Sequence, residues 1–456
     1  MQSSINPANG ELLAQLPLHD DAEVDRSLTA AAAAQKSWRK VPVAGRCKLL
    51  TAMAQVLRAN KADHARLITL EIGKPITESL AEIEKCAVTC DFYAAKAPEF
   101  LADEIIESNA SQSGVCFDPL GVVLAIMPWN YPFWQFFRFA APALAAGNGA
   151  ILKHAANVPQ CAVAIEQAMV QAGCPEGLMQ SLLIGSGKVG GMIADDRIAA
   201  VTLTGSTQVG QIVAAQAGQA LKKQVLKIGG SDPFIVLDDA DIPAAAAVAV
   251  KSRYINVGQS CVNAKRFIVE DSVYDAFTAA FIAGVKALKI GDPMDPETQI
   301  GPMARANLRD ELHDQVVRSI HDGAVCALGG APLDREGSWY APTVLTDVTP
   351  EHTSFREELF GPVASIIRAR DADHAVALAN QTEFGLGASV WTQDMGAARA
   401  LMCQIDAGAV FINGMVVSDA RLPFGGIKKS GYGRELGQYG FREFTNMKTF
   451  WIGPAQ

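Results

Sequence analysis

The sequence predicts an α/β protein built on a parallel β-sheet that is covered by helices. From residue 120 to 240, short apolar runs such as VVLAIM (122–127) and IAAVTL (198–203) alternate with segments of helical periodicity. Strand–helix–strand repeats with wholly apolar strands are typical of buried parallel sheets. A second alternation runs from 241 to about 420, and 456 residues allow two or three domains. Ligands of such sheets bind at the carboxyl ends of the strands.

Each element is expected from its apolar periodicity. Segments 43–60 and 76–97 carry apolar side chains at helical spacing, and the stretch 109–118 indicates an exposed hairpin arm. The first alternation is expected to contain a helix over 163–172 and strands at VVLAIM, GAILK, SLLIG, IAAVTL, VLKI and FIVL. The second is expected to contain helices over 244–254, 274–288 and 372–381, and strands at RFIVE, AVCALGG, VLTDV, ASIIRA, SVWT and GAVFING. A strand-like segment, TFWIG, ends the chain.

Composition narrows the class of protein. The net charge of −9 argues against a general nucleic-acid binder, which would need a basic face. The nine cysteines are scattered and include no CxxC pair, so we expect a reducing cytoplasm, no disulfide framework and no metal site. The first sixteen residues lack the basic start and apolar core of a signal peptide.

The segment 121–147 has the length of a membrane helix and a single charge, Arg138. Three prolines and the polar residues Asn130 and Gln135 interrupt it. We therefore expect a buried strand, a turn and a buried helix, and no membrane partner.

One cysteine has a setting suited to chemistry. Cys261 lies in the glycine-containing polar segment NVGQSCVNAKRF, where a thiolate nucleophile would find backbone N–H groups for an oxyanion. The alternative is a small buried core residue, and the residues alone leave both open.

Three other segments allow a ligand or a purely structural role. In TLTGSTQVGQ, Gly205 and Ser206 join a strand to a helix whose first N–H groups can hold a phosphate. Trp129 and Asn130 end a predicted strand in MPWNYP, and an asparagine amide can donate to an oxyanion. Lys153 lies at the end of the next predicted strand. It is either an ordinary surface lysine or a contact to a phosphate or ribose.

These four segments, in this order, resemble the aldehyde dehydrogenase superfamily. NPANGE (6–11), EELFGPV (357–363) and PFGGIKKSGYGRELG (423–437) agree with it, so the similarity extends from about Ile5 to the end. It implies a Rossmann-like cofactor domain (1–109 and 127–230), an α/β catalytic domain (231–422) and a small β oligomerisation arm (110–126 and 423–456). The cofactor domain would have five strands, and the arm would build a homodimer or homotetramer.

The resemblance also implies a mechanism. Cys261 would attack the aldehyde carbon to form a thiohemiacetal, whose oxyanion the Cys261 N–H and the Asn130 amide would hold. Hydride transfer to a nicotinamide would leave a thioester, which water would release as an acid. The cofactor contacts carried over by position are Trp129, Lys153, Ala156, Gly205, Ser206, Gly229, Glu358 and Phe360. Members that prefer NAD often have a glutamate three residues after the lysine. Ala156 stands there, so NADP is expected, with NAD as a slower substitute.

The runs PWNYPFWQFFR, KHAANVP, GGSDPFIVL and VSDARLPFGG are most similar to the succinate-semialdehyde dehydrogenase branch. That similarity places Arg138, Ser418 and Trp134 around an aldehyde with a distal carboxylate. The alternative for Arg138 is an internal salt bridge, because a buried arginine needs a partner. Ile255 replaces a second arginine that some members carry, which weakens the choice of substrate.

Lys227, in QVLKIGG, stands where the hydrolytic members have the glutamate that activates water. A protonated lysine cannot accept a proton, so the expected consequence is slow thioester release. A second interpretation makes the lysine a weak base, or lets it swing away while Glu435 relays a proton. A third replaces hydrolysis by thiol exchange, as in CoA-acylating members. A non-catalytic structural protein on the same fold is the remaining alternative.

Overall fold

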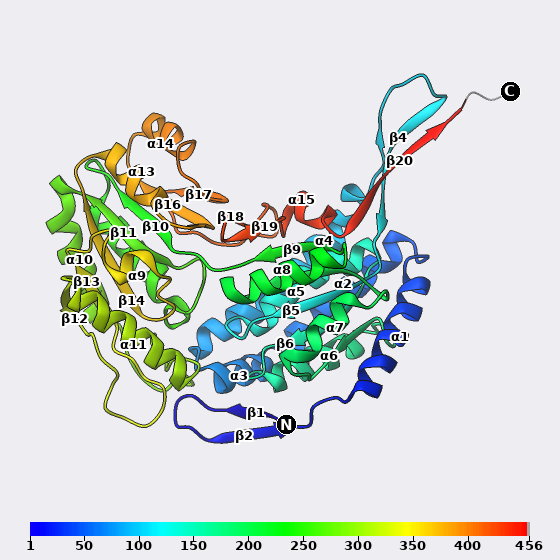
Figure 1. Ribbon diagram of the computed structural model, residues 1–456, viewed down its shortest axis with the longest axis horizontal. Helices are drawn as coiled ribbons and strands as arrows, with labels where there is room; N and C mark the ends of the chain where they lie inside the picture. The colour runs from blue at the N-terminus through cyan, green and yellow to red at the C-terminus, as the bar shows by residue number, and fades with distance from the viewer. Residues whose placement is uncertain (454–456) are drawn as a thin grey trace.

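Two β-sheets, one in each lobe of the molecule, organise the fold (Figure 1). The computed structural model describes residues 1–453. The first lobe holds a six-stranded sheet in the order β19-β9-β8-β5-β6-β7. Its strands are β5 (Val122–Met127), β6 (Gly149–His154), β7 (Met179–Ser181), β8 (Ile198–Thr204), β9 (Lys223–Lys227) and β19 (Gly431–Tyr432). Five strands are parallel, as expected, and the short β19 adds an antiparallel edge beside β9.

Helices cover both faces of this sheet, which explains its apolar strands. All six residues of β5 are buried: Val123 and Ala125 face one cluster, while Val122 and Leu124 face another. The first cluster is closed by α2 (Val43–Ala59), α3 (Lys61–Ile72), α4 (Ile76–Phe100), α5 (Pro132–Ala146) and α6 (Pro159–Gln171). The second is closed by α1 (Asp21–Trp38), α7 (Val189–Ala194) and α8 (Thr207–Gln219).

The second lobe holds a seven-stranded sheet in the order β12-β13-β14-β11-β10-β16-β17. Its strands are β10 (Asp232–Val236), β11 (Ala264–Glu270), β12 (Val325–Leu328), β13 (Thr343–Thr346), β14 (Val363–Ala369), β16 (Gly387–Trp391) and β17 (Ala409–Ile412). All pairs are parallel except β12 with β13. Its helices are α9 (Ile242–Tyr254), α10 (Tyr274–Lys286), α11 (Ala306–His321), α12 (Thr353–Arg356), α13 (Ala372–Asn380) and α14 (Met395–Met402). The predicted α/β fold class is confirmed.

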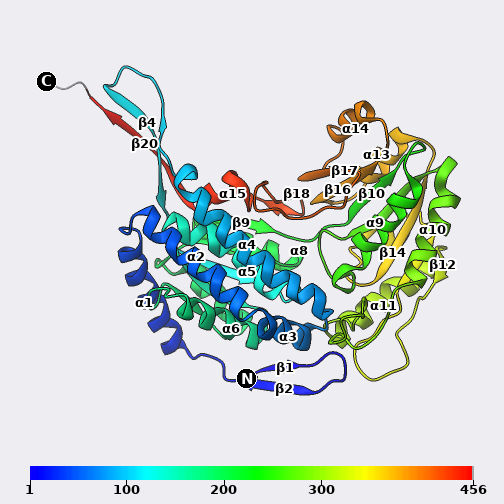
Figure 2. The same ribbon diagram turned by 180° about the vertical axis from the view of Figure 1, so that it is seen from behind.

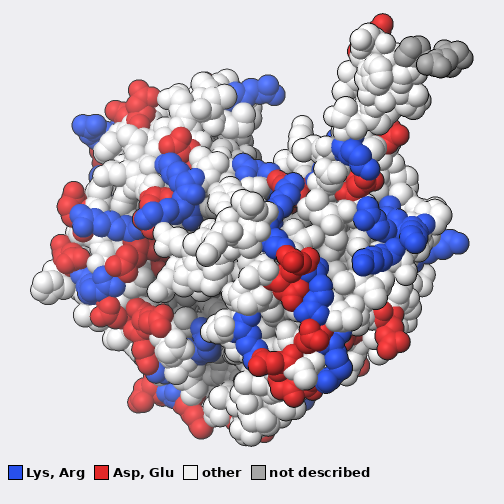
Figure 3. Space-filling view, turned by 45° about the vertical axis from the view of Figure 1, so that its right-hand side comes forward, with Lys and Arg blue, Asp and Glu red and all other residues white. Residues whose placement is uncertain are grey.

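A three-stranded antiparallel arm projects from the first lobe (Figures 1 and 2). It consists of β3 (Glu104–Ile105), β4 (Gln112–Pro119) and β20 (Thr445–Ile452), and β4 pairs with β20 along its whole length. In the view of Figure 3 the projecting arm shows few charged side chains. The strands of the arm cover less of the chain than the expected ranges 110–126 and 423–456. Strands β5 and β19 belong to the six-stranded sheet, and α15 (Gly437–Arg442) packs on α5.

Two small pairs complete the chain: β1 (Gln2–Ile5) with β2 (Leu12–Leu16), and β15 (Phe384–Gly385) with β18 (Ile427–Lys428). The SLLIG segment differs from expectation, because the strand there spans 179–181 and ends where SLLIG begins. No helix within residues 1–453 has the length and apolar character needed to cross a membrane.

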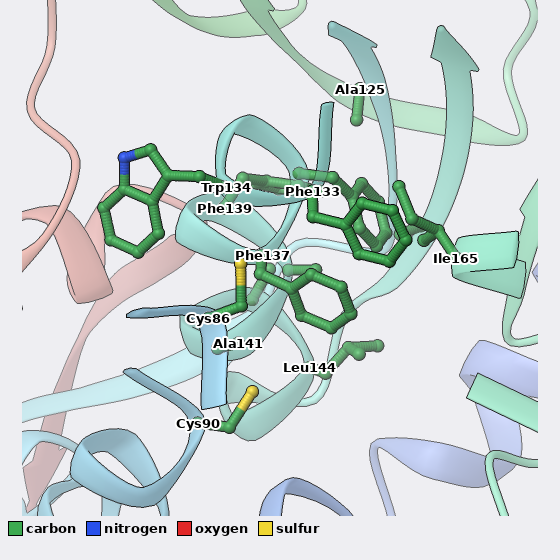
Figure 4. Close-up of a cluster of buried hydrophobic side chains, with 14 of the residues drawn as sticks. Cys86, Cys90, Ala125, Phe133, Trp134, Phe137, Phe139, Ala141, Leu144 and Ile165 are labelled. Atoms are coloured by element: carbon green, nitrogen blue, oxygen red, sulfur yellow. The ribbon is translucent and has the colours of Figure 1, made fainter. Parts of the chain in front are cut away.

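Helix α5 is the centre of the first lobe. All fifteen of its residues are buried, as expected for a helix that is apolar all round. Figure 4 shows Phe133 and Phe137 among the buried side chains near Cys86 of α4, while Trp134 points away from them. The Phe133 and Phe137 rings stack with centroids 6.3 Å apart, and Phe136 meets Phe137 edge-on at 5.6 Å.

Truncating this cluster should destabilise the first lobe. Phe137 is 0% exposed, so Phe137→Ala is expected to lower the free energy of unfolding by about 3–5 kcal/mol, through lost burial and the cavity left behind. The matched control is Val170→Ala at the 67% exposed position on α6, which should stay within about 0.5 kcal/mol. Urea unfolding followed by far-UV circular dichroism measures both. Equal effects would show that α5 does not centre the core.

Candidate active site

Cys261 opens into a cavity of about 200 Å³ between α4, α5, the end of β9 and the segment 415–418. Five charged residues line it: Glu78, Glu82, Lys85, Arg138 and Lys227. A larger cavity of about 710 Å³ under α9 and α10 shares Glu78 and Ile255 with it but is lined by no cysteine. The nucleophile therefore identifies the smaller cavity as the candidate site.

A strained turn leads from α9 to Cys261. Asn256 and Val257 have φ angles of +54° and +55°, a left-handed conformation that costs a β-branched valine in particular. Gly258 follows at φ +70°, and a Cβ there would lie 2.2 Å from the Gly361 carbonyl oxygen. Such strain persists only where surrounding contacts enforce it, and it is concentrated at functional sites.

Hydrogen bonds from the first lobe hold this turn. The Asn256 backbone N–H donates to Glu78 Oε2 at 2.7 Å, and its side-chain amide donates to the Asn130 carbonyl at 2.8 Å. Asn130 in turn donates its own amide to the Gln259 carbonyl at 2.9 Å. The structure thus brings Asn130 beside the loop of Cys261, and the second N–H of its amide is left to donate elsewhere.

Lys265 fixes the loop from the other side. This buried ammonium donates to the carbonyls of Ser260 and Cys261 at 2.9 and 2.8 Å and pairs with Glu358 at 3.2 Å. Burial lowers the pKa of Lys265, while Glu358 and Asp232 raise it. The Ser260 carbonyl shares its peptide group with the Cys261 N–H. The hydrogen bond from the charged Lys265 ammonium to that oxygen polarises the peptide group, so the Cys261 N–H becomes a stronger donor to a developing oxyanion.

Lys227 ends β9 with its ammonium directed at the nucleophile. Its Nζ donates to Cys261 Sγ and lies 5.5 Å from the centre of the Phe424 ring. The side chain is only 1% exposed. An ammonium has donors and no acceptor, so this position holds the sulfur but cannot take a proton from water while it is charged.

Arg138 has an internal partner. Its Nη2 lies 2.7 Å from Glu435 Oε2 and donates to Thr204 Oγ1 at 3.0 Å. Within residues 1–453, its Nε has no hydrogen-bond partner. The pair that the sequence left as an alternative is present, and it joins two residues that the sequence assigned to separate roles. Arg138 still lines the cavity with Trp134 and Ser418.

The expected cofactor residues lie at the carboxyl ends of parallel strands in the first lobe and on the facing loop. Trp129 follows β5 and meets Phe360 edge-on at 5.8 Å. Ser206 caps α8 by accepting from the Val209 N–H at 3.4 Å, next to Gly205. A Cβ on Gly229 would lie 2.4 Å from Glu358 Oε2, so a larger residue there would displace the Glu358 side chain.

Lys153 and Ala156 have the charge and exposure expected of residues that face the added phosphate of a phosphorylated dinucleotide cofactor. Burial lowers the pKa of Lys153, and no nearby carboxylate contributes to that shift. Ala156 is exposed. A half-buried cation with no acidic partner among the described residues fits a phosphorylated dinucleotide. Within the same residues, no group of three or more His, Cys, Asp or Glu is arranged to hold a metal ion.

Sequence reasoning missed Glu78, Lys85 and Lys265. The first two lie on one face of α4, where Glu78, Ala81, Glu82 and Lys85 follow the i, i+3, i+4, i+7 spacing and all line the cavity. The signal was present as charged residues on the apolar side of a predicted helix. Lys265 gave no such signal, because its partners are two backbone carbonyls and Glu358, a carboxylate far along the chain.

Comparison with known proteins identifies a family and several relatives. The model of the aldehyde dehydrogenase family matches residues 1–450. A protein of Synechocystis sp. named probable succinate-semialdehyde dehydrogenase (NADP+) is 50% identical over 99% of both chains. The Escherichia coli succinate semialdehyde dehydrogenase (NAD(P)+) Sad is 50% identical over 98% of this chain and 97% of its own. The crystal structure of succinic semialdehyde dehydrogenase from Streptococcus pyogenes with NADP+ has a TM-score of 0.97, 37% identity and complete coverage of both chains.

Glu78 should make stability depend on pH. Burial raises its pKa from 4.5 to about 7, against smaller opposing effects of Lys74 and the Asn256 N–H. The folded state thus binds the Glu78 proton more tightly than the unfolded state does. The stability that this protonated carboxyl contributes is lost as pH rises from about 4.5 through 7. Relative to the unsubstituted protein, Glu78→Gln should gain stability across this range, by about 1–3 kcal/mol. Urea unfolding at pH 5, 6, 7 and 8 measures the difference.

The control for this series is Glu107→Gln, which changes an exposed carboxylate before β4. A Glu78→Gln difference that stays constant with pH would contradict the shifted titration of Glu78.

Proposed function

Because the chain belongs to the aldehyde dehydrogenase family, we propose that it oxidises succinic semialdehyde to succinate with NADP at Cys261. The observation that carries the proposal is the cavity of Cys261, which combines a nucleophile, an amide beside it and cationic side chains. Two relatives that are 50% identical along the chain carry this activity in their names. The nine free cysteines support a cytoplasmic enzyme.

The chain's own groups account for the first half-reaction, while the second lacks a general base among the described residues. Cys261 loses its proton to solvent water, its thiolate sulfur bonds to the aldehyde carbon as the carbonyl π bond opens, and the new oxyanion accepts from the Cys261 N–H and the Asn130 amide. A nicotinamide bound at the ends of β5, β6 and β8 would accept hydride from that carbon. The carbonyl then re-forms as a thioester. Water adds to it, the sulfur–carbon bond breaks, and the acid and the thiol are released.

NADP is the proposed cofactor, with NAD as a slower substitute. Lys153 would bind the phosphate on the adenosine ribose, and no carboxylate at position 156 would repel it. The N-terminus of α8, with Gly205 and Ser206, would hold the pyrophosphate. Trp129, Gly229, Glu358 and Phe360 would border the nicotinamide half.

The distal carboxylate is proposed to bind at the end of the cavity that holds Arg138, Ser418 and Trp134. Arg138 is already paired with Glu435 through Nη2, which also donates to Thr204. The arginine therefore contributes less charge to this end than a lone guanidinium would.

Thioester release is proposed to be the slow half-reaction. Lys227 donates to Cys261 Sγ and takes the place of the glutamate that activates water in hydrolytic relatives. Glu435 is paired with Arg138 and does not replace that base. Acylation needs only Cys261, Asn130 and the cofactor, so the first half-reaction keeps its groups.

A homodimer or homotetramer is proposed to form through the arm. Five of its apolar side chains are each more than half exposed, namely Ile105, Ile106, Met447, Trp451 and Ile452. Clustered apolar residues on a projecting sheet favour burial against another copy of the chain.

Rapid mixing of enzyme, NADP and succinic semialdehyde tests the function and the role of Lys227 together. We expect a burst of about one reduced cofactor per Cys261, followed by slow turnover, because acylation precedes the blocked step. Lys227→Glu should raise the steady rate at least about tenfold and leave the burst amplitude in place. Lys36→Glu makes the same change of charge at an exposed position on α1 and should alter neither phase.

Fast turnover without a burst would contradict slow release. Turnover that requires coenzyme A would favour the acylating alternative. Absence of both burst and turnover, with Cys261 resistant to iodoacetamide, would favour a non-catalytic protein.

Ala156→Glu should reverse the cofactor preference. A carboxylate near Lys153 would repel the added phosphate and accept hydrogen bonds from a ribose, so the ratio of kcat/KM for NADP to that for NAD should fall by roughly 10- to 100-fold. Ala33→Glu, on the exposed side of α1, is the control. Steady-state kinetics with both cofactors measure the ratio, and an unchanged ratio would exclude this position from cofactor choice.

A further inference from the structure

We infer that Lys85 binds the distal carboxylate of the substrate together with Ser418, and so selects acidic over neutral aldehydes. The inference rests on the proposed function and adds a residue that the sequence motifs do not identify. The supporting observation is that Lys85, alone among the described charged residues lining the cavity of Cys261, contacts only a hydroxyl and an aromatic ring.

Four of the five charged residues that line the cavity have partners within the protein. Glu82 pairs with Lys74 and accepts from the N–H groups of Phe133 and Trp134 at the start of α5. Arg138 pairs with Glu435. The remaining two have single contacts, since Glu78 accepts from the Asn256 N–H and Lys227 donates to Cys261 Sγ.

Lys85 has no such compensation. In the described chain its ammonium donates to Ser418 Oγ at 2.9 Å and lies 4.3 Å from the centre of the Trp134 ring. The neighbouring carboxylate of Asp419 is itself paired with Arg421 at 2.6 Å. A largely buried cation that meets only a hydroxyl and an aromatic face still has hydrogen-bond donors for an anion.

The position of Lys85 suits the far end of an aldehyde. It lies seven residues after Glu78 on the same face of α4, which places their Cα atoms about 10 Å apart along the helix axis. Glu78 meets the turn that leads to Cys261, while Lys85 meets Ser418. Because Ser418 accepts from Lys85, its own O–H is free to donate to the same carboxylate.

Electrostatics at Lys85 favour an anionic ligand. Burial, and to a smaller extent Arg138 from α5, lower its pKa to about 8. Cys86 and Glu82 from its own helix and Asp419 from the facing loop act in the opposite direction. A bound carboxylate would offset the repulsion between the two cations and keep Lys85 protonated.

The first test compares Lys85→Met with the unsubstituted enzyme on succinic semialdehyde and on butanal, which lacks the carboxylate. Met keeps the length of the side chain over Trp134. The ratio of kcat/KM for succinic semialdehyde to that for butanal should fall about 10- to 100-fold, mainly through KM. Lys85→Arg should restore much of the ratio, and Lys96→Met, at an exposed site on α4, should leave it unchanged. An equal loss on both aldehydes would overturn the inference.

The pH dependence gives a second readout. In the unsubstituted enzyme the ratio should fall as pH rises from 7 to 9, because Lys85 loses its charge, and Lys85→Arg should flatten that fall. A ratio that falls equally in Lys85→Arg would count against Lys85.

A third measurement does not depend on turnover. Succinate should protect Cys261 from iodoacetamide, and Lys85→Met should raise the half-protecting concentration at least about tenfold. If succinate protects both proteins equally or neither, the inference fails. If protection depends on Lys85 but succinic semialdehyde is not oxidised, the proposed function fails and the anion site stands.

Discussion

The strained turn at 256–258 is the constraint on which the site depends. It ends α9 in the second lobe, yet Glu78 and Asn130 of the first lobe hold it by hydrogen bonds of 2.7 and 2.8 Å. Two consecutive non-glycine residues with positive φ would relax without these contacts. The turn therefore forms only where the lobes meet, and it delivers Cys261 to the carboxyl edge of the six-stranded sheet, where ligands of parallel sheets bind. The candidate nucleophile, the Asn130 amide and the edge proposed to hold the cofactor are thus placed by one junction.

Some charged residues of the site are paired with each other and hold the structure together, whereas others are left to meet a ligand. The buried Lys74–Glu82 pair anchors the start of α5, and Glu82 also satisfies two N–H groups that the helix itself leaves unpaired. Arg138 and Glu435 join α5 to the segment before α15. Such pairs are costly to break from one side, which makes them poor candidates for groups that change charge during turnover. The groups left to meet a ligand are Cys261, Lys85 and Lys227.

Much of this arrangement could be predicted from the sequence. The strand at 122–127 and the helix over 244–254 follow from apolar runs and helical spacing, and the structure has them within two residues. The position of Cys261 beside Asn130 followed from family motifs, because spacing alone does not say which loops meet. What escaped prediction depends on tertiary contact. The salt bridge of Arg138 with Glu435 joins residues 297 positions apart, so no periodic pattern identifies Glu435 as the partner. Strand β19 is only two residues long, which is too short to show a pattern. Helix α11 was missed because only Leu312, Val316 and Ser319 of its residues are buried.

In the proposed function, the lysine at position 227 changes the chemistry of the site while the strand that carries it stays in place. Its backbone is fixed on both sides, by pairing with Gly431 in β19 and by a hydrogen bond from the Gly205 N–H at 3.2 Å. Gly431 cannot be replaced freely, because a Cβ there would lie 2.0 Å from the Leu226 carbonyl oxygen. Any side chain at position 227 therefore leaves the strand toward Cys261. A carboxylate there would accept a proton from water, whereas the ammonium donates to the sulfur. In the proposed mechanism the two half-reactions use separate elements: the turn and Asn130 serve formation of the thioester, and the side chain at the end of β9 serves its release.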